Sequence, residues 1–321
     1  MKLFSSWQQY PMMYIVYYDD IYFLIEYCTG GIFMYSDFHV HTYYSDDSGY
    51  PMEDVVKDAI KKGITDICFT DHVDYGIKPD QNELTDEVRL AIRSVVKYTK
   101  DYNVDYPAYV AEIKSLQEKY GDKINIRMGM EFGLQVHTIP QFQKLYDSYD
   151  FDFIIMSCHQ VEDKEFWRQD FQKGRTQDEY NQRYYDEILG QVKNFHDYSV
   201  LGHLDLISRY DKAGLYPFEK VKNKITEILK IVIADGKGIE INTSSVRYGI
   251  KDKDGNPELT PSKEILKLYK ELGGRILTIG SDSHAPDHLG THIKEQLEVA
   301  KEIGFTEICT FEKMKPVFHK I

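Results

Sequence analysis

The sequence predicts an α/β protein in which parallel strands alternate with helices and close, or nearly close, into a barrel. After Met34, short β-rich runs alternate with segments of helical periodicity, in about seven or eight units over roughly 285 residues. Residue types that bind metals follow the strands along the whole chain. An open doubly wound sheet would also place ligands at the carboxyl ends of its strands, but it gathers them at one crevice. Ligands contributed by the whole order of strands favour the barrel.

The expected strands are short runs rich in apolar and β-branched residues, bounded by turn-forming residues. They are Ser36–His41, Thr65–Thr70, Ile124–Glu131, Asp152–Cys158, Ser199–His203, Gly238–Asn242, Arg275–Gly280 and Thr306–Phe311.

The expected helices repeat apolar residues at helical spacing. The first should end at Gly63, and a later one should carry Pro261 in its first turn and end at Gly273, as helices prefer. The expected helices are Met52–Lys62, Asp178–Phe195, Pro217–Ala234, Pro261–Leu272 and Leu289–Ile303.

Composition excludes several classes of protein. Of the 321 residues, 42% are hydrophobic and 14% aromatic, which are values typical of globular proteins. The formal net charge is -13. Phosphate backbones are bound by clustered Lys and Arg, so nucleic acid is not the expected partner. A small phosphorylated substrate is compatible with the acidic composition, because bound metal ions supply local positive charge.

The four cysteines show no C-x-x-C spacing, which predicts free thiols in a reducing cytoplasm. They are Cys28, Cys68, Cys158 and Cys309.

The start of the chain differs from the rest. Residues 12–33 are apolar and tyrosine-rich, but Asp19, Asp20 and Glu26 interrupt them, which is too broken for a membrane span, and no signal-peptide pattern is present. We expect residues 1–33 to be a non-catalytic extension, with Met34 as the working start and residues 34–321 as the catalytic domain. Gly76–Tyr109, the longest insertion after a strand, is expected to form a lid or side wall.

Two pairs of potential ligands carry the chemistry. On an extended chain, residues two apart point to the same side, so His39 with His41, and Asp282 with His284, would each face one point. Imidazole and carboxylate are ligands for zinc, manganese or iron. A single pair of this kind is a weak signal, but further ligand types end the strands between them. These are His72, Glu131, His159 and His203, whereas surface or structural roles are expected for His137, His196, His288, His292 and His319.

Several of these segments occur in an order that resembles a known family, the PHP (polymerase and histidinol phosphatase) superfamily of metal-dependent phosphoesterases. They are Asp37-Phe38-His39-Val40-His41-Thr42, Thr70-Asp71-His72, Met130-Glu131, Ser157-Cys158-His159, Gly202-His203-Leu204-Asp205 and Ser281-Asp282-Ser283-His284. The resemblance runs from about Tyr35 to the end. Within the superfamily, Glu307–Glu312 with Lys315-Pro316 resembles the histidinol-phosphatase branch. The resemblance implies a distorted (β/α)7 barrel with three divalent metal ions at the carboxyl ends of its strands.

The resemblance also implies how the ligands divide among the ions. His39, His41, Glu131 and Asp282 would hold the first, and Glu131 would bridge to a second held by His159 and His203. The third would be held by His72, His284 and the residue eight after His39. Many relatives have histidine at that last position, but this chain has Asp47. A carboxylate there is harder than imidazole and favours manganese or iron over zinc. The alternative role for Asp47 is a loop cap beside Asp46.

Charge favours a phosphoryl substrate independently of the family. Three divalent ions, less the carboxylates of Glu131, Asp47 and Asp282 and a bridging hydroxide, leave about two positive charges, which match a phosphate monoester dianion. Metal coordination also lowers the pKa of water, which makes in-line attack on phosphorus the expected chemistry. Arginine meets phosphate with two hydrogen bonds. Arg209, near His203, is the first candidate for a phosphate clamp, and Arg168 and Arg175 are the next; Asp71 and Asp205 are candidates to orient ligand histidines.

The resemblance implies the hydrolysis of L-histidinol phosphate to L-histidinol and phosphate, in histidine biosynthesis, and we expect Glu131, Asp282, His284 and Arg209 to be the catalytic residues. One alternative is a PHP phosphoesterase acting on another small phosphate, on nucleic acid or on protein phosphotyrosine. A second is a non-catalytic metal-binding protein on the same fold, which predicts bound metal without turnover. No P-loop, dinucleotide-binding or nucleophile-elbow motif occurs. Sequence leaves the metals loaded, the general acid, the residues that contact the imidazole and amine, and the oligomeric state undecided.

Overall fold

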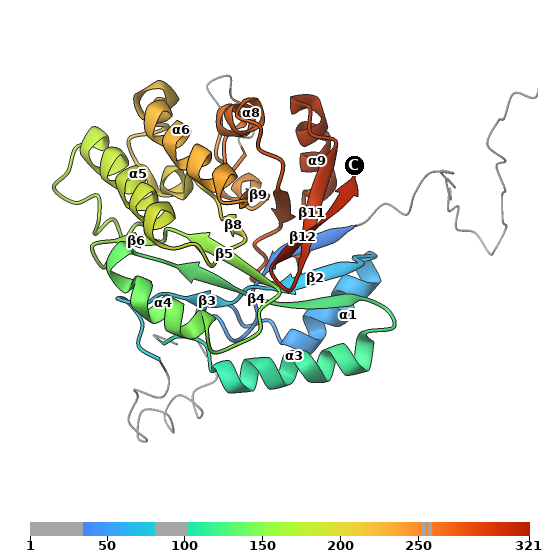
Figure 1. Ribbon diagram of the computed structural model, residues 1–321. Coiled ribbons are helices and arrows are strands. Elements are labelled where there is room, and N and C mark those ends of the chain that lie inside the picture. Colours follow the sequence, from blue (N-terminus) through green and yellow to red (C-terminus); the bar gives the residue numbers. More distant parts are fainter. Residues whose placement is uncertain (1–34, 81–101, 252–254, 256–258) are drawn as a thin grey trace, which may run out of the picture. The chain divides into compact units, whose positions relative to one another are not determined.

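The computed structural model describes residues 35–80, 102–251, 255 and 259–321 (Figure 1). The expected extension over residues 1–33, its boundary at Met34 and most of the expected lid therefore lie outside the described residues. No helix in the described ranges is long and apolar enough to cross a membrane.

Parallel strands form a nearly closed barrel, as predicted. Along the sheet the order is β1 (Ser36–Val40), β2 (Asp66–Phe69), β4 (Asn125–Gly133), β5 (Phe153–Ser157), β8 (Val200–Leu201), β9 (Gly238–Asn242) and β10 (Leu277–Gly280), and the two-residue β3 (His72–Val73) pairs with β4.

The chain just after β10 returns to β1 and brings the two ends of the sheet together. Ser283 forms a parallel bridge with Val40, the backbone N–H of His41 donates to the Ser283 carbonyl at 2.8 Å, and the N–H of Ser283 donates to the His39 carbonyl at 3.2 Å. The closure therefore places the first and last predicted ligand pairs side by side.

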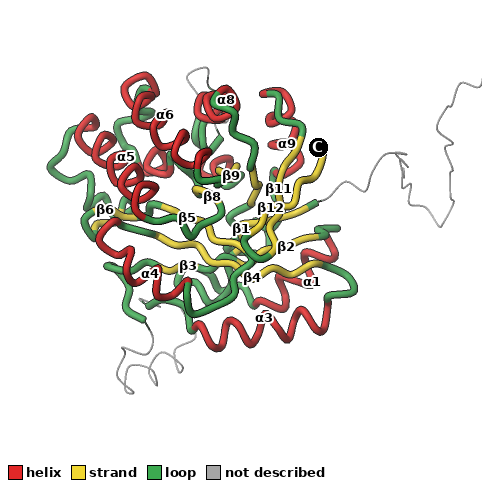
Figure 2. The backbone as a smooth tube through the Cα atoms, in the orientation of Figure 1, coloured by secondary structure: helices red, strands yellow, loops and turns green. Residues whose placement is uncertain are grey.

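Helices pack around the outside of the strands (Figure 2). They are α1 (Met52–Lys62), α3 (Tyr106–Tyr120), α4 (Ile139–Tyr146), α5 (Gln177–Asn194), α6 (Phe218–Ala234), α8 (Lys263–Glu271) and α9 (Ile293–Ile303). α3 and α4 are not among the helices expected from the sequence. The shorter elements are η2 (Val136–Thr138), β6 (Gln160–Val161), β7 (Lys164–Glu165), η3 (Leu206–Tyr210) and α7 (Ser245–Tyr248).

Helix termini follow local chemistry. α1 ends at Gly63 in the left-handed conformation (φ 77°), as predicted. The N-cap of α5 is Thr176, whose side chain accepts from the N–H of Glu179 in a reciprocal capping box. The expectation that Pro261 lies in the first turn of α8 was wrong. Ser262 caps that helix by accepting from the N–H of Ile265, so the helix begins at Lys263 and the proline lies before the cap.

The last expected strand does not join the barrel. β11 (Glu307–Glu312) instead forms an antiparallel hairpin with β12 (Lys315–Lys320), red in Figure 1. Its turn binds the chain just before β5, because the N–H of Lys313 donates to the Asp152 carboxylate at 2.9 Å. A small apolar cluster lies here, in which Phe311 packs on Phe153 with ring centroids 5.1 Å apart. The hairpin thus covers the amino-terminal end of the barrel with apolar side chains and leaves the polar chemistry to the carboxyl end.

β10 approaches β1 closely at Gly280. A Cβ added there would lie 2.2 Å from the Cβ of His39 and 2.8 Å from its backbone nitrogen. We therefore expect Gly280→Ala to lower the free energy of unfolding by about 1–3 kcal/mol, measured by urea denaturation, because overpacking forces the strands apart. Gly49→Ala is the control, since a Cβ there meets nothing within 4 Å. Equal stability of the two variants would contradict the close approach.

Candidate metal centre

All nine predicted ligand residues lie together at the carboxyl end of the barrel. They come from β1 and the loop after it, from β3 and β4, and from the loops that follow β5, β8 and β10. The residues are His39, His41, Asp47, His72, Glu131, His159, His203, Asp282 and His284.

The first group of ligand atoms surrounds one point. The Nε2 of His39 lies 3.2 Å from Glu131 Oε2 and 3.6 Å from Asp282 Oδ1. The Nε2 of His41 lies 3.5 and 3.4 Å from the same two oxygens. A tetrahedral ion with ligand bonds of about 2.0–2.2 Å separates its ligand atoms by roughly 3.3–3.6 Å. The spacing of this group therefore fits a metal ion.

The second group uses the other oxygen of the same carboxylate. Glu131 Oε1 lies 3.1 Å from His159 Nε2 and 2.8 Å from His203 Nε2, and it also accepts from the Ser157 hydroxyl at 2.7 Å. Glu131 thus presents one oxygen to each of two groups of histidines.

The third group lies nearer to solvent. Asp47 Oδ2 is 3.2 Å from His284 Nε2 and 3.6 Å from His72 Nε2, and the two histidine nitrogens are 3.4 Å apart. The Asp47 side chain is 54% exposed. Its neighbour Asp46 turns away and accepts from Lys78 Nζ at 2.7 Å. The Asp47 carboxylate therefore faces the two histidines.

Buried polar atoms in these groups lack hydrogen-bond partners, which is unusual in a protein interior. Among the described residues they include His39 Nε2, His41 Nε2, His72 Nδ1 and Glu131 Oε2. Leaving such atoms unpaired is costly unless something else binds them. Their orientation toward shared points fits divalent cations.

The protonation states of Glu131 and His41 suit metal binding. Burial raises the pKa of Glu131, but the charges of His39, His159 and His72 lower it further, so its pKa lies well below the usual range and the carboxylate is ionised. Burial and the charges of His284 and His72 hold the pKa of His41 well below its usual value. A neutral imidazole and an ionised carboxylate are the forms that bind a metal.

Three residues that the sequence analysis missed orient the histidines. His39 Nδ1 donates to Glu240 at 2.6 Å, His159 Nδ1 donates to Asp74 at 2.8 Å, and His41 Nδ1 is 3.1 Å from the Ser45 hydroxyl. Each contact turns Nε2 of the ring toward the groups described above. Two of them carried a sequence signal: Glu240 is an acid inside an apolar strand, and Asp74 lies two residues after His72.

The two acids that were predicted for this orienting role act differently. Asp71 accepts from the Ser45 hydroxyl at 2.7 Å, so it supports His41 through Ser45. Asp205 accepts from the N–H of Ser262 at 2.9 Å and thereby joins the loop after β8 to the cap of α8.

Asp282 reaches the site by a backbone conformation that the strand argument did not foresee. It follows β10 with φ 53°, so the expectation of an extended chain at Asp282 and His284 was wrong. Arg247 holds this turn by donating to the Asp282 carbonyl at 2.8 Å. Oδ1 of Asp282 faces the histidines, while Oδ2 accepts from the Ser244 hydroxyl at 3.0 Å and from Arg209 at 3.3 Å.

Of the three predicted arginines, Arg209 lies at the site. Besides Asp282, it donates to Asn242 at 3.0 Å, and its guanidinium packs 4.8 Å from the Tyr248 ring centroid. Arg168 and Arg175 lie after β7 and pair with Glu165 and Glu162. In the described ranges neither forms a hydrogen bond or ion pair with a predicted metal ligand.

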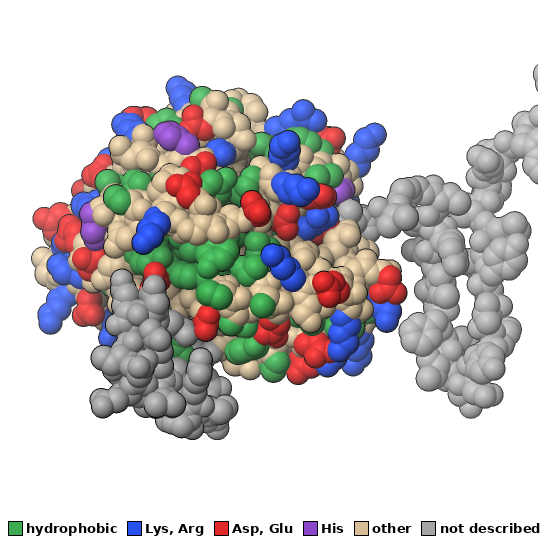
Figure 3. All heavy atoms as spheres, turned by 60° about the horizontal axis from the view of Figure 1, so that its bottom comes forward, with side chains coloured by type: hydrophobic (Ala, Val, Ile, Leu, Met, Phe, Trp, Pro, Cys, Tyr) green, Lys and Arg blue, Asp and Glu red, His purple; other side chains and the backbone are tan. Residues whose placement is uncertain are grey.

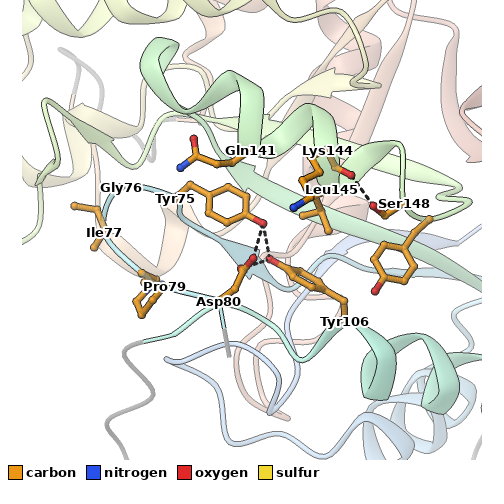
Figure 4. Close-up of a pocket in the computed structure, with 12 residues that line it drawn as sticks. Tyr75, Gly76, Ile77, Pro79, Asp80, Tyr106, Gln141, Lys144, Leu145 and Ser148 are labelled. Carbon is orange, nitrogen blue, oxygen red and sulfur yellow. Dashed lines mark hydrogen bonds between the residues drawn. The ribbon is translucent and has the colours of Figure 1, made fainter. Parts of the chain in front are cut away.

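A separate cavity of about 490 Å³ lies beside the loop after β3, against α3 and α4 (Figure 4). The hydroxyls of Tyr75 and Tyr106 both donate to Asp80, at 3.2 and 2.9 Å, so these polar groups satisfy one another. The cavity has no predicted ligand in its lining.

On the surface, Figure 3 shows hydrophobic side chains gathered on the face that lies toward the bottom of Figure 1.

Known proteins are similar to this chain over most of its length. The PHP domain family model matches residues 37–244. The histidinol-phosphatase of Lactococcus lactis is 31% identical over 284 residues, which cover 87% of this chain and 95% of that protein. A probable histidinol-phosphatase of Clostridium acetobutylicum is 29% identical over 89% of this chain and 96% of its own length.

Two solved structures are similar to this chain. The crystal structure of the Lactococcus lactis histidinol phosphate phosphatase, complexed with zinc, L-histidinol and phosphate, matches with a TM-score of 0.73 at 30% identity. The match covers 88% of this chain and 98% of that one. A structure of a putative histidinol phosphatase from Listeria monocytogenes has the same fold, with a TM-score of 0.61 at 19% identity over 81% of this chain and 99% of its own.

Metal affinity is expected to rise with pH. Burial lowers the pKa of His159, but Glu131 and Asp74 raise it more, to about 9 in the metal-free protein. Below that pH a metal must displace a proton from the ring, so affinity should increase by up to about tenfold per pH unit per proton displaced. Zinc titrations between about pH 6.5 and 8 measure this slope. A pH-independent affinity would contradict the protonation assigned to His159.

Arg209→Ala is expected to lower metal retention after gel filtration as well as phosphate affinity, because the guanidinium holds Asp282 through a buried ion pair. Arg168→Ala is the matched control, since Arg168 is exposed and pairs with Glu165. If both variants retain metal like the wild type, Arg209 does not position Asp282.

Proposed function

The chain belongs to the PHP domain family, and from this premise we propose that it is a metal-dependent histidinol-phosphatase that hydrolyses L-histidinol phosphate to L-histidinol and phosphate. The observation that carries the proposal is the buried Glu131 carboxylate, whose two oxygens each face a separate group of histidine nitrogens. The choice of substrate is supported by the histidinol-phosphatase relatives, which align with nearly the whole chain.

We assign the ligands as the resemblance to the PHP family implies, and their spacing supports the assignment. His39, His41, Glu131 and Asp282 would hold one ion, and Glu131, His159 and His203 a second. Asp47, His72 and His284 would hold a third. When bound, such ions polarise the phosphate oxygens and acidify the water that attacks phosphorus. The carboxylate at Asp47 favours manganese or iron at the third position.

The protein's own residues determine where the phosphate binds. Asp282 is held in place through Oδ2 by Ser244, Asn242 and Arg209, which leaves Oδ1 directed at the ligand group. The Arg209 side chain is 3% exposed, and its Nε has no hydrogen-bond partner among the described residues. A phosphate oxygen beside Asp282 would satisfy this donor and offset the positive charge. Arg209 therefore serves two roles in the proposal: it fixes Asp282 and borders the phosphate.

Turnover is expected after reconstitution with manganese, zinc or iron. The wild type should release phosphate from L-histidinol phosphate, and Asp282→Ala should be slower by on the order of 100-fold or more, because it removes a ligand from the reacting centre. The measurement is phosphate release under saturating metal.

Asp287→Ala is the matched control, because Asp287 lies five residues along and its side chain is 86% exposed. It should retain wild-type activity. Release from an aryl phosphate but not from L-histidinol phosphate would redirect the substrate to another small phosphate. Bound metal without turnover of either substrate would contradict catalysis altogether.

A further inference from the structure

Glu240 is a buried acid in the middle of β9 that the proposed mechanism does not yet use. Its side chain is 1% exposed, and in the described part of the chain no lysine or arginine pairs with it. Its partners are instead His39, through Nδ1 at 2.6 Å, the backbone N–H of His203 at 3.1 Å, and Asn242 Nδ2 at 3.3 Å. A carboxylate in the barrel interior is thus surrounded by the supports of the metal centre.

The two oxygens of Glu240 serve different groups of ligands. Oε1 accepts from His39, which belongs to the first group, and Oε2 accepts from the backbone of His203, which belongs to the second. Asn242 donates both to Glu240 and to Asp282 Oδ2, at 3.2 Å, and so extends the link to a third ligand. Glu131 joins the two groups on the metal side, and Glu240 joins them on the opposite side.

The backbone around Glu240 leaves room for this carboxylate. A Cβ added to Gly280 would lie 2.9 Å from Glu240 Oε1, and one added to Gly202 would lie 3.6 Å from Oε2. Gly280 at the end of β10 and Gly202 just after β8 thus border the carboxylate, and at Gly280 a larger residue would press on it.

We propose that Glu240 is a positioning residue whose negative charge couples the first and second metal subsites through His39 and His203. The inference rests on the metal centre of the proposed function and deepens it. By accepting from Nδ1, Glu240 holds His39 in the tautomer whose Nε2 lone pair faces Glu131 and Asp282. When metal ions are bound on the far side of that ring, they would offset the cost of burying the Glu240 carboxylate beside a neutral His39.

Replacing Glu240 by glutamine removes the negative charge but keeps nearly the same side-chain shape. If its amide oxygen accepts from His39, its NH₂ group faces two donors, the His203 N–H and Asn242 Nδ2. If the amide is reversed, His39 Nδ1 must accept, and the proton moves to Nε2, the atom that faces the metal. Both arrangements weaken the site without a change in side-chain volume, which makes Glu240→Gln an informative variant.

The test measures metal binding directly. Metal-free protein is titrated with zinc in competition with a chromophoric chelator, and the ions bound per chain are counted. Glu240→Gln is expected to bind the ions about 10–100-fold more weakly than the wild type, the range found when partners of ligating histidines are removed. Glu240→Asp keeps the charge but is one methylene shorter, and we expect it to lie between the two.

Glu187→Gln is the matched control. Glu187 is also a buried acid, 5% exposed, but it lies on α5 and binds the N–H of Val136 and Arg183. A general effect of losing a buried carboxylate would appear in both variants as lower stability of the metal-free protein. Only a positioning role predicts a selective loss of metal affinity in Glu240→Gln.

The outcomes separate the two proposals. A loss of affinity in Glu240→Gln at least fivefold larger than in Glu187→Gln supports the coupling, and a smaller difference overturns it. If Glu240→Gln does not fold, Glu240→Asp is titrated instead, and a metal affinity no lower than that of Glu187→Gln overturns the coupling. A wild type that binds no zinc refutes the metal centre of the proposed function itself, whereas zinc binding that is insensitive to Glu240 refutes only this inference.

Discussion

The rest of the site depends on the burial of the Glu131 carboxylate. A negative charge that is fully removed from water is tolerated only where positive charge or strong donors surround it. Here His39, His41 and His72 approach one oxygen, and His159 and His203 approach the other. The barrel supplies this geometry because the carboxyl ends of its strands meet around one axis.

The amino end of the barrel is closed by apolar packing, whereas the carboxyl end carries the polar residues of the site. At the amino end, the β11–β12 hairpin packs Phe311 against Phe153 and excludes water. At the carboxyl end, three of the predicted ligand histidines, His39, His41 and His159, are each held by a second residue, so their rings are oriented before any metal binds. This arrangement reduces the reorganisation needed on binding, because carboxylates and hydroxyls from Glu240, Asp74 and Ser45 already fix the imidazoles.

Much of this was predictable from sequence, and the failures have physical reasons. The alternation of strands and helices predicted the barrel, and the spacing of His39 and His41 on one strand placed both at a single point. The same reasoning failed in detail for Asp282, because that residue lies beyond the end of β10 in a left-handed conformation set by Arg247. Two partners of the histidines, Glu240 and Asp74, were missed because they come from distant parts of the chain. Glu240 is 201 residues from His39, and Asp74 is 85 residues from His159.

The most direct test of the account is a crystal structure of metal-loaded protein, with anomalous diffraction recorded at the absorption edge of the metal. The account predicts an ion on each side of Glu131, about 3.5–4 Å apart as in other two-metal sites, with one carboxylate oxygen on each. His39, His41 and Asp282 would ligate the first ion, and His159 and His203 the second. A single ion, or ions that do not contact Glu131, would contradict the central claim.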